Sequence, residues 1–171
     1  MTQIAVWFER KFSFGYPKEL LPNLMARLRG TPVRLEEELR GYTHQRLIAR
    51  PEHGWSAQEN AGHLLQLEPL WLTRVEDFVR GSSTLTPTDL ANRATTDAGY
   101  NERPLEEILS GFRSARSKLL TRVASLEEDA WERSIVHPRL KQPMTLTDHL
   151  FFVAEHDDHH LARIWELFEG L

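Results

Sequence analysis

The chain has 171 residues, of which 40% are hydrophobic and 27% are charged, and it contains no cysteine. This length fits one domain with a sizeable core, and the lack of cysteine excludes disulfides, cysteine-ligated zinc, iron–sulfur clusters and a cysteine nucleophile. The net charge of -4 gives no overall basic field for nucleic acid or an anionic membrane. With no apolar run near the roughly 20 residues of a membrane span and no signal-peptide pattern, we expect a cytoplasmic protein.

The first half of the chain predicts two long helices. Leucines at helical spacing indicate the first helix over residues 17–42. The second helix has a sharper start, because Ser56 followed by Glu59 forms a capping-box pattern that opens a helix at Ala57. A broad apolar face follows, and Gly81 ends this helix.

The second half predicts a crossover and two further long helices. Residues 81–103 are polar and indicate a crossover with at most a turn or two of helix. The third helix opens at Pro104, and Ser125 with Glu128 gives a second capping-box pattern for a short helix. A proline-containing loop then leads to the last helix, over residues 145–168. The crossover is long enough to return along a whole helix, so the connection lengths allow an up-down-down-up bundle.

Histidines on two of these helices are the strongest chemical signal. His156 and His160 lie one turn apart, a spacing at which two imidazoles converge on one metal, although it also arises by chance. His63 shares a face with leucines of the second helix, where its partner is either that metal or a carboxylate or carbonyl. His149 shares the face of His156 two turns away, and His159 falls at the edge of the site or in solvent.

Other functional patterns fit less well. Glu59 lies one turn before His63 and is placed to orient it, although its simpler role is the capping box. The run His156 to His160 is similar to a zincin motif with Asp in place of Glu, but too little chain follows for the further ligand. Paired Glu-x-x-His motifs, glycine-rich phosphate loops and a Gly-x-Ser-x-Gly elbow are absent from the sequence.

Two segments together resemble the DinB superfamily. They are GWSAQENAGHLL (Gly54 to Leu65) and AEHDDHHLARI (Ala154 to Ile164), and the resemblance extends over nearly the whole chain. The leading segment from Trp7 is similar to that of a DinB subgroup without assigned activity. The resemblance implies an all-α, four-helix bundle of up-down-down-up topology. It also implies a single domain over residues 1–171, in which residues 1–16 form an extension that packs on the bundle or on a partner.

The resemblance also implies a metal site. Family members bind a divalent metal, often zinc or nickel, through one histidine of the second helix and two of the fourth. Matched to this sequence, these ligands are His63, His156 and His160. Three imidazoles accept iron or manganese as well.

Two positions depart from the family pattern. Many members have Gln where this chain has Arg163, which lies on the face of His156 and is placed either to bind a substrate anion or to pair with Glu59 or Glu166. Some relatives have another histidine where this chain has Phe152, so we expect an apolar floor.

The resemblance implies a metal-dependent enzyme that acts on a small molecule, either a thiol-dependent S-transferase or a hydrolase. The transferase would use a low-molecular-weight thiol such as bacillithiol, mycothiol or glutathione, and no residue beyond the metal and its bound water or thiolate is assigned to catalysis. We also expect a homodimer, with no nucleic-acid or membrane partner. The alternative is a non-catalytic metal-binding or interaction bundle, which a buried fourth ligand such as His149 or Glu59 would indicate.

Overall fold

The structure is a computed structural model that describes residues 4–169. Four long helices form its body: α1 (Leu21–Leu39), α3 (Ala57–Arg80), α5 (Leu105–Ala124) and α7 (Leu146–Glu169). The shorter elements are α2 (His44–Ile48), α4 (Arg93–Asp97), α6 (Glu128–Glu132), the 3₁₀ turns Trp7–Glu9, Lys18–Leu20 and Tyr100–Glu102, and the strands β1 (Ser134–Val136) and β2 (Pro143–Thr145). None of the described helices is long and apolar enough to cross a membrane.

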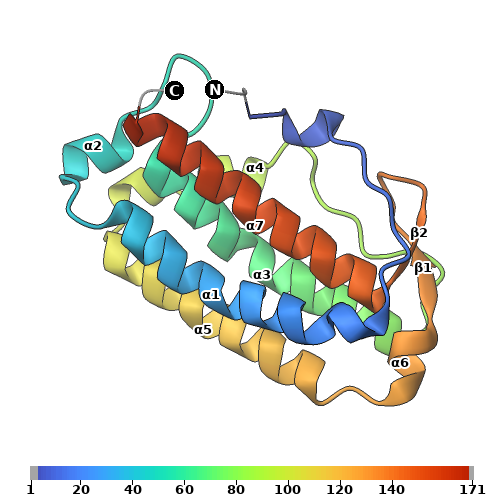
Figure 1. The fold of residues 1–171 in the computed structure, drawn as a ribbon. Helices are drawn as coiled ribbons and strands as arrows, with labels where there is room; N and C mark the ends of the chain where they lie inside the picture. The colour runs from blue at the N-terminus through green and yellow to red at the C-terminus, as the bar shows by residue number, and fades with distance from the viewer. Residues whose placement is uncertain (1–3, 170–171) are drawn as a thin grey trace.

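The four long helices form an up-down-down-up bundle. In Figure 1, α1 and α7 run in one direction, whereas α3 and α5 run in the other. The main packing pairs are α3 with α5, α1 with α7, α1 with α5 and α3 with α7. Helices α1 and α3 therefore lie on opposite sides of the bundle, although they follow each other in the chain. The all-α class and the topology predicted from the sequence are confirmed.

Local side-chain contacts fix where α3 and α7 begin. At the start of α3, the Ser56 hydroxyl accepts from the Glu59 N–H at 3.1 Å, and the Glu59 carboxylate accepts from the Ser56 N–H at 3.0 Å. This is the predicted capping box. Thr145 and Asp148 make the same reciprocal pair before α7, at 3.2 and 2.9 Å. Gly81 ends α3 with a φ of 69°, which a residue with a side chain rarely adopts.

The second predicted capping box is wrong. The Ser125 hydroxyl donates to the Arg122 carbonyl at 2.8 Å and so belongs to the end of α5. Helix α6 begins at Glu128 after Glu127, and no side chain caps it. The serine satisfies a free carbonyl of the helix that it ends, and this competes with capping the next helix.

A small hairpin occupies the segment that the sequence indicated as a loop. Strands β1 and β2 pair antiparallel with Ile135 opposite Met144, and both side chains are buried in the core. Thr84 forms an isolated parallel bridge with Val136 and so attaches the crossover to the hairpin. The strands were missed because each has only three residues and the segment contains two prolines. The hairpin matters for function because it places His137 in the interior.

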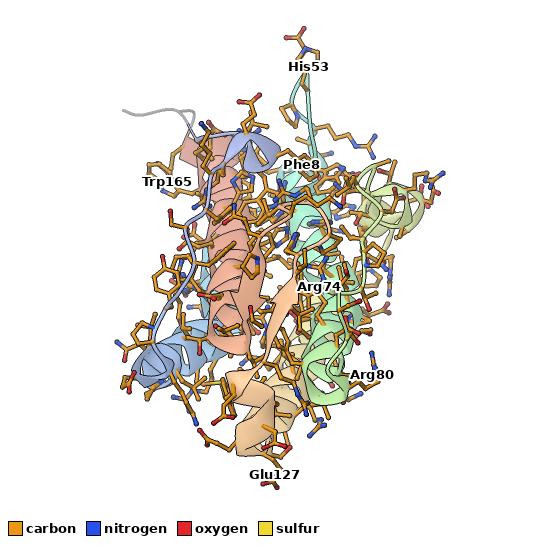
Figure 2. All side chains as sticks on the ribbon, turned by 90° about the vertical axis from the view of Figure 1, so that its right-hand side faces the viewer. Phe8, His53, Arg74, Arg80, Glu127 and Trp165 are labelled. Atoms are coloured by element: carbon orange, nitrogen blue, oxygen red, sulfur yellow. The ribbon has the colours of Figure 1, made fainter. Side chains whose placement is uncertain are left out.

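Residues 4–16 of the expected 1–16 extension pack on the bundle of their own chain, and residues 1–3 lie outside the described residues. Phe12 is buried in the core, and the Gly15 and Tyr16 N–H groups donate to Asp148 at 2.8 and 2.9 Å. Arg10 donates to Glu155 of α7 at 2.5 Å. In Figure 1 this segment runs along the outer side of α7. His53 and Glu127 lie at opposite ends of the molecule (Figure 2).

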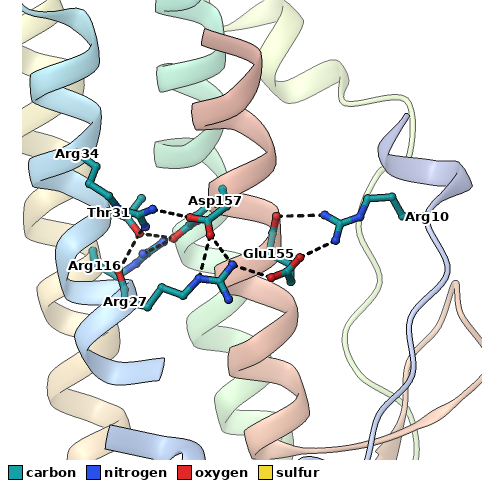
Figure 3. A network of polar contacts seen from close by, with 8 residues as sticks. Arg10, Arg27, Thr31, Arg34, Arg116, Glu155 and Asp157 are labelled. Atoms are coloured by element: carbon teal, nitrogen blue, oxygen red, sulfur yellow. Dashed lines mark hydrogen bonds and ion pairs between the residues drawn. The ribbon is translucent and has the colours of Figure 1, made fainter. Parts of the chain in front are cut away.

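The guanidinium of Arg116 joins all four long helices. From α5 it donates two hydrogen bonds to Asp157 of α7 and two to Glu68 of α3, at 2.6 to 3.1 Å. It also donates to the Leu28 carbonyl of α1 at 3.0 Å. Thr31 of α1 donates to the same Asp157 carboxylate at 2.8 Å, as Figure 3 shows. Because these polar groups are buried, they stabilise the fold only as a complete set.

Burial also alters the protonation of this network. It raises the pKa of Glu68 to about 7, because the loss of solvent opposes the charged carboxylate more strongly than Arg116 favours it. Glu68 therefore takes up a proton more readily than an exposed glutamate, and Arg116 opposes this by donating to it.

We predict that replacing Arg116 by Met lowers the free energy of unfolding by about 3–5 kcal/mol, because Asp157 is left as a buried charge without a partner. Arg113→Met is the matched control on α5. Arg113 is exposed and pairs with Glu36, so its loss should cost less than about 1 kcal/mol. Urea denaturation of both variants measures the difference, and similar losses would contradict this role for Arg116.

Candidate metal centre

Three buried histidines from α3 and α7 converge on one point. The Nε2 atom of His156 lies 3.4 Å from Nε2 of His63 and 3.3 Å from Nε2 of His160. The three histidines form a group whose ligand atoms all lie within 4.8 Å of one another. The structure therefore brings together the three residues that the sequence singled out as ligands.

The spacing of the nitrogens fits a tetrahedral metal site. With metal–nitrogen bonds of about 2.0–2.1 Å, two ligand nitrogens of a tetrahedral complex lie about 3.3–3.4 Å apart. The two nitrogen–nitrogen distances of 3.4 and 3.3 Å agree with this value. Three imidazoles on one side leave a fourth direction open.

The partners of the outer ring nitrogens favour ligation through Nε2. The Asn60 amide donates to the Ser56 carbonyl at 2.8 Å, which turns its oxygen toward His160 Nδ1, also at 2.8 Å. His160 must therefore donate from Nδ1 and keep a lone pair on Nε2. His63 Nδ1 lies 2.9 Å from the Thr95 hydroxyl of α4, which accepts the proton in the same tautomer.

Burial keeps all three rings neutral. It lowers the pKa of His63 to about 3 and the pKa values of His156 and His160 well below their ordinary value, with the neighbouring imidazoles adding to the effect. When Thr95 accepts from His63 as Asn60 does from His160, the lone pairs of both rings face His156, whose single proton can satisfy only one of them. A divalent cation satisfies all three nitrogens at once, so the donor set fits a metal.

A cavity of about 500 Å³ opens beside these histidines. Its walls carry Trp7 of the N-terminal segment, with its ring 5.0 Å from that of His156, and Trp55, with its ring 4.6 Å from that of His63. Phe152 lines the cavity and lies 5.2 Å from Trp7, as the expected apolar floor requires. The lining includes three arginines, Arg74, Arg139 and Arg163, and no acidic residue among the described part of the chain.

The remaining predicted residues near the centre have different surroundings. Arg163 lines the cavity and pairs with Glu166, one of the two partners that the sequence suggested. His159 also lines the cavity, with its ring 5.2 Å from that of His160. Glu59 pairs with Arg50 and serves the capping box, and it is not part of the cavity wall. The outer nitrogen of His63 contacts Thr95 instead.

His149 lies in the core, outside the cavity lining. Its ring centroid is 5.9 Å from that of Trp71 and 6.0 Å from that of Phe78. The side chain is fully buried, and neither ring nitrogen makes a hydrogen bond of normal geometry. Although it shares a helix face with His156, the two-turn separation carries it out of the cluster.

A model of the DinB superfamily matches residues 27–164. The chain belongs to the DinB superfamily. A curated relative, the uncharacterized protein YuaE of Bacillus subtilis (strain 168), is 26% identical and is covered over 94% of its length, with 81% of this chain aligned.

Two solved structures have a similar fold. The first, YfiT from Bacillus subtilis, is described as a probable metal-dependent hydrolase with an unusual four-helix bundle topology. It aligns with a TM-score of 0.81 at 20% identity, over 95% of this chain and 93% of YfiT. A mycothiol-dependent maleylpyruvate isomerase aligns with a TM-score of 0.67 at 12% identity, over 83% of this chain and 59% of that protein. These likenesses establish a DinB-like bundle.

Several residues of this region were missed from the sequence. Thr95 lies in the polar crossover, and helical periodicity gives no signal for a residue that contacts His63 from a distant loop. His137 lies in the segment that the sequence indicated as a loop, but it is buried, with 2% of it exposed, because the hairpin folds it inward. Arg74 is a cation within the apolar pattern of α3, and that exception is the one signal that pointed to it.

We predict that His149→Leu stabilises the chain more at pH 5 than at pH 7, by about 2 kcal/mol. Burial holds the pKa of His149 well below its ordinary value, so below pH 6.5 the unfolded chain binds a proton there and the folded chain does not. Falling pH therefore destabilises the native chain through His149, and the variant lacks this one contribution while it keeps those of the other buried histidines. Denaturation at both pH values, with the exposed His53→Leu as control, measures this, and a pH-independent difference would contradict it.

The amount of metal that the chain retains tests the assignment of the three histidines as ligands. The untagged chain should retain about one zinc or nickel ion, and His156→Ala should retain none, because two imidazoles are too few for a stable site. His53→Ala removes an exposed histidine at one end of the molecule. Since His53 does not belong to the three-histidine group, this change should leave the metal content unchanged. Elemental analysis after gel filtration measures the metal content per chain. Equal metal content in the two variants would refute the ligand assignment.

Proposed function

We propose that this DinB-superfamily chain is a metal-dependent enzyme that acts on a small molecule, with hydrolysis as the first reaction to test. One observation carries this proposal: the three convergent imidazoles border a cavity, and the metal-ligand group within the described residues contains no fourth protein ligand. A purely structural site is normally closed by four protein ligands. The geometry thus favours a catalytic site over the alternative of a non-catalytic metal-binding bundle.

At this centre, some residues would bind the metal ion and others orient the residues that bind it. His63, His156 and His160 would hold the ion, Asn60 fixes the tautomer of His160, and Thr95 orients the ring of His63. A divalent metal bound there supplies a Lewis acid that polarises a carbonyl and lowers the pKa of bound water or of a thiol. Zinc and nickel are the first metals to test, and iron and manganese fit the same ligands.

The aromatic walls would exclude bulk water from the reaction. Trp7, Trp55 and Trp71 surround the histidines with apolar surface, and the Trp71 ring lies 5.5 Å from that of His156. Electrostatic contacts are stronger where water is excluded. The N-terminal segment contributes Trp7, so the bundle alone does not complete the cavity.

The similar proteins support two reaction types. YfiT, a probable metal-dependent hydrolase, aligns over nearly the whole chain and favours hydrolysis. The mycothiol-dependent isomerase favours thiol chemistry as a second candidate. Since this chain has no cysteine, a thiol reaction would need an external low-molecular-weight thiol. A cytoplasmic location and a homodimer remain parts of this proposal.

The test compares turnover of the zinc- and nickel-loaded chain with that of His156→Ala. A panel of small esters and amides is assayed without thiol, and electrophiles are assayed with and without bacillithiol, mycothiol or glutathione. We expect metal-dependent hydrolysis that the variant lacks. Turnover only when a thiol is added would select the transferase, and no turnover by a fully loaded chain in either panel would leave the non-catalytic bundle as the better account.

A further inference from the structure

Arg74 is a buried cation without an acidic partner. It projects from α3 on the face of the molecule seen in Figure 2, and 1% of it is exposed. Its Nε donates to the Thr86 carbonyl at 2.9 Å, but one terminal nitrogen makes no hydrogen bond. Asp77, one turn along α3, is occupied by Arg80 and by the Thr86 N–H. Among the described residues, no carboxylate pairs with Arg74, whereas the other fully buried arginine, Arg116, has two.

The contact between Arg74 and His137 brings two donors together. The N–H groups of Arg139 and Leu140 both lie 3.2 Å from His137 Nδ1, which must accept from them and therefore carries no proton. Burial lowers the pKa of His137 to about 3, so the ring is neutral and its single proton is on Nε2. Nε2 lies 3.3 Å from a terminal nitrogen of Arg74, which is also a donor. Two donors face each other, and an acceptor that contacts both would relieve this conflict.

Arg139 adds a second cation to the same wall of the cavity. One of its terminal nitrogens is buried without a hydrogen bond, and the other lies 3.5 Å from the Phe8 carbonyl. Burial, with a smaller contribution from the charge of Arg139, lowers the pKa of Arg74 to about 10, and the nearby Asp77 carboxylate opposes this shift. Both guanidinium groups remain charged at neutral pH. Arg163, for which the sequence left an anion contact and an ion pair open, is paired with Glu166.

We propose that Arg74, Arg139 and the Nε2–H of His137 form a binding subsite for an oxyanion, the carboxylate or phosphate group of a small-molecule substrate. A guanidinium with a free terminal nitrogen is suited to either anion. This inference rests on the proposed function and adds its substrate class. The subsite is separate from the three histidines, because Trp71 lies between them, with its ring 5.4 Å from the Arg74 Cζ and 5.5 Å from the His156 ring.

The arrangement also limits the shape of the substrate. The anion would bind at the arginines while the reacting group lies at the histidines, and the Trp71 ring contacts both Arg74 and His156. The wall between them is aromatic, so the connecting part of the molecule should be apolar. A small anionic molecule with a reactive bond a few atoms from its charged end satisfies both conditions.

Calorimetric titration of the zinc-loaded chain tests this subsite with benzoate, phenyl phosphate and benzamide. Benzoate and benzamide have nearly the same shape but differ in charge. We expect saturable binding of at least one anion, with benzamide about tenfold weaker or more. The preferred anion distinguishes a carboxylate substrate from a phosphate substrate.

Substitution of the two arginines tests whether they bind the anion. Arg139→Gln and Arg74→Gln should each weaken anion binding about tenfold or more, because each removes a charged donor. Arg139 is partly exposed, so its variant stays informative if Arg74→Gln unfolds. Arg113→Gln, on the exposed surface of α5, is the matched control and should bind normally.

The outcomes separate this subsite from the metal site. Anion binding that persists in Arg139→Gln and disappears in His156→Ala would place the anion on the metal and overturn the subsite. Binding of benzamide as tight as that of the preferred anion, or no binding of either anion, would also overturn it. Arginine-dependent binding by a chain that retains no metal would support the subsite while contradicting the proposed function.

Discussion

The hydrogen bonds of one guanidinium hold the four long helices of this chain in register. Arg116 contacts Glu68 of α3 and Asp157 of α7, and it contacts a carbonyl of α1. Asp157 directly follows His156, and Glu68 lies five residues after His63. The same contacts that align α3 with α7 therefore also set the distances among the three imidazoles. A shift of one ångström between these helices would exceed the tolerance of a metal site.

The two sides of α7 differ in the kind of charged groups that they contact. One side carries ion pairs in which arginines of α1 and α5 meet acidic residues, and Figure 3 shows how Arg27 and Arg116 meet that face. The cavity side carries neutral imidazoles and arginines without an acidic residue in the described lining. Three neutral ligands leave the full charge of a divalent ion uncompensated, so an anion is the natural complement of this cavity. The metal site and the Arg74 subsite thus favour the same class of substrate.

The sequence predicted features that depend on local or periodic patterns. The capping box of Ser56, the start of α7 at Thr145 and the convergence of the two histidines of α7 all follow from spacing along one helix. The resemblance to the family added His63 and the topology. Features created by distant contacts were not predictable in the same way. His137 and Thr95 reach the interior only because a three-residue hairpin and a polar crossover fold back on α3.

A single pattern can also belong to two elements, and this limits interpretation from sequence. Ser125 matches a capping box but contacts the helix that precedes it. Arg163 shares the face of His156 but pairs with Glu166, while the unpaired cation of the cavity is Arg74 on another helix. In each case the pattern gives the direction of a side chain, and the tertiary fold decides which of the possible partners it contacts.

X-ray absorption spectroscopy of the zinc-loaded chain tests whether three histidines hold the ion at an open site. The method counts the ligands of the ion and measures their distances. We expect three imidazole nitrogens at about 2.0–2.1 Å and one exchangeable oxygen ligand from solvent. A zinc ion bound by four protein side chains would contradict the open site. A chain that fails to retain zinc or nickel after loading would contradict the metal centre itself.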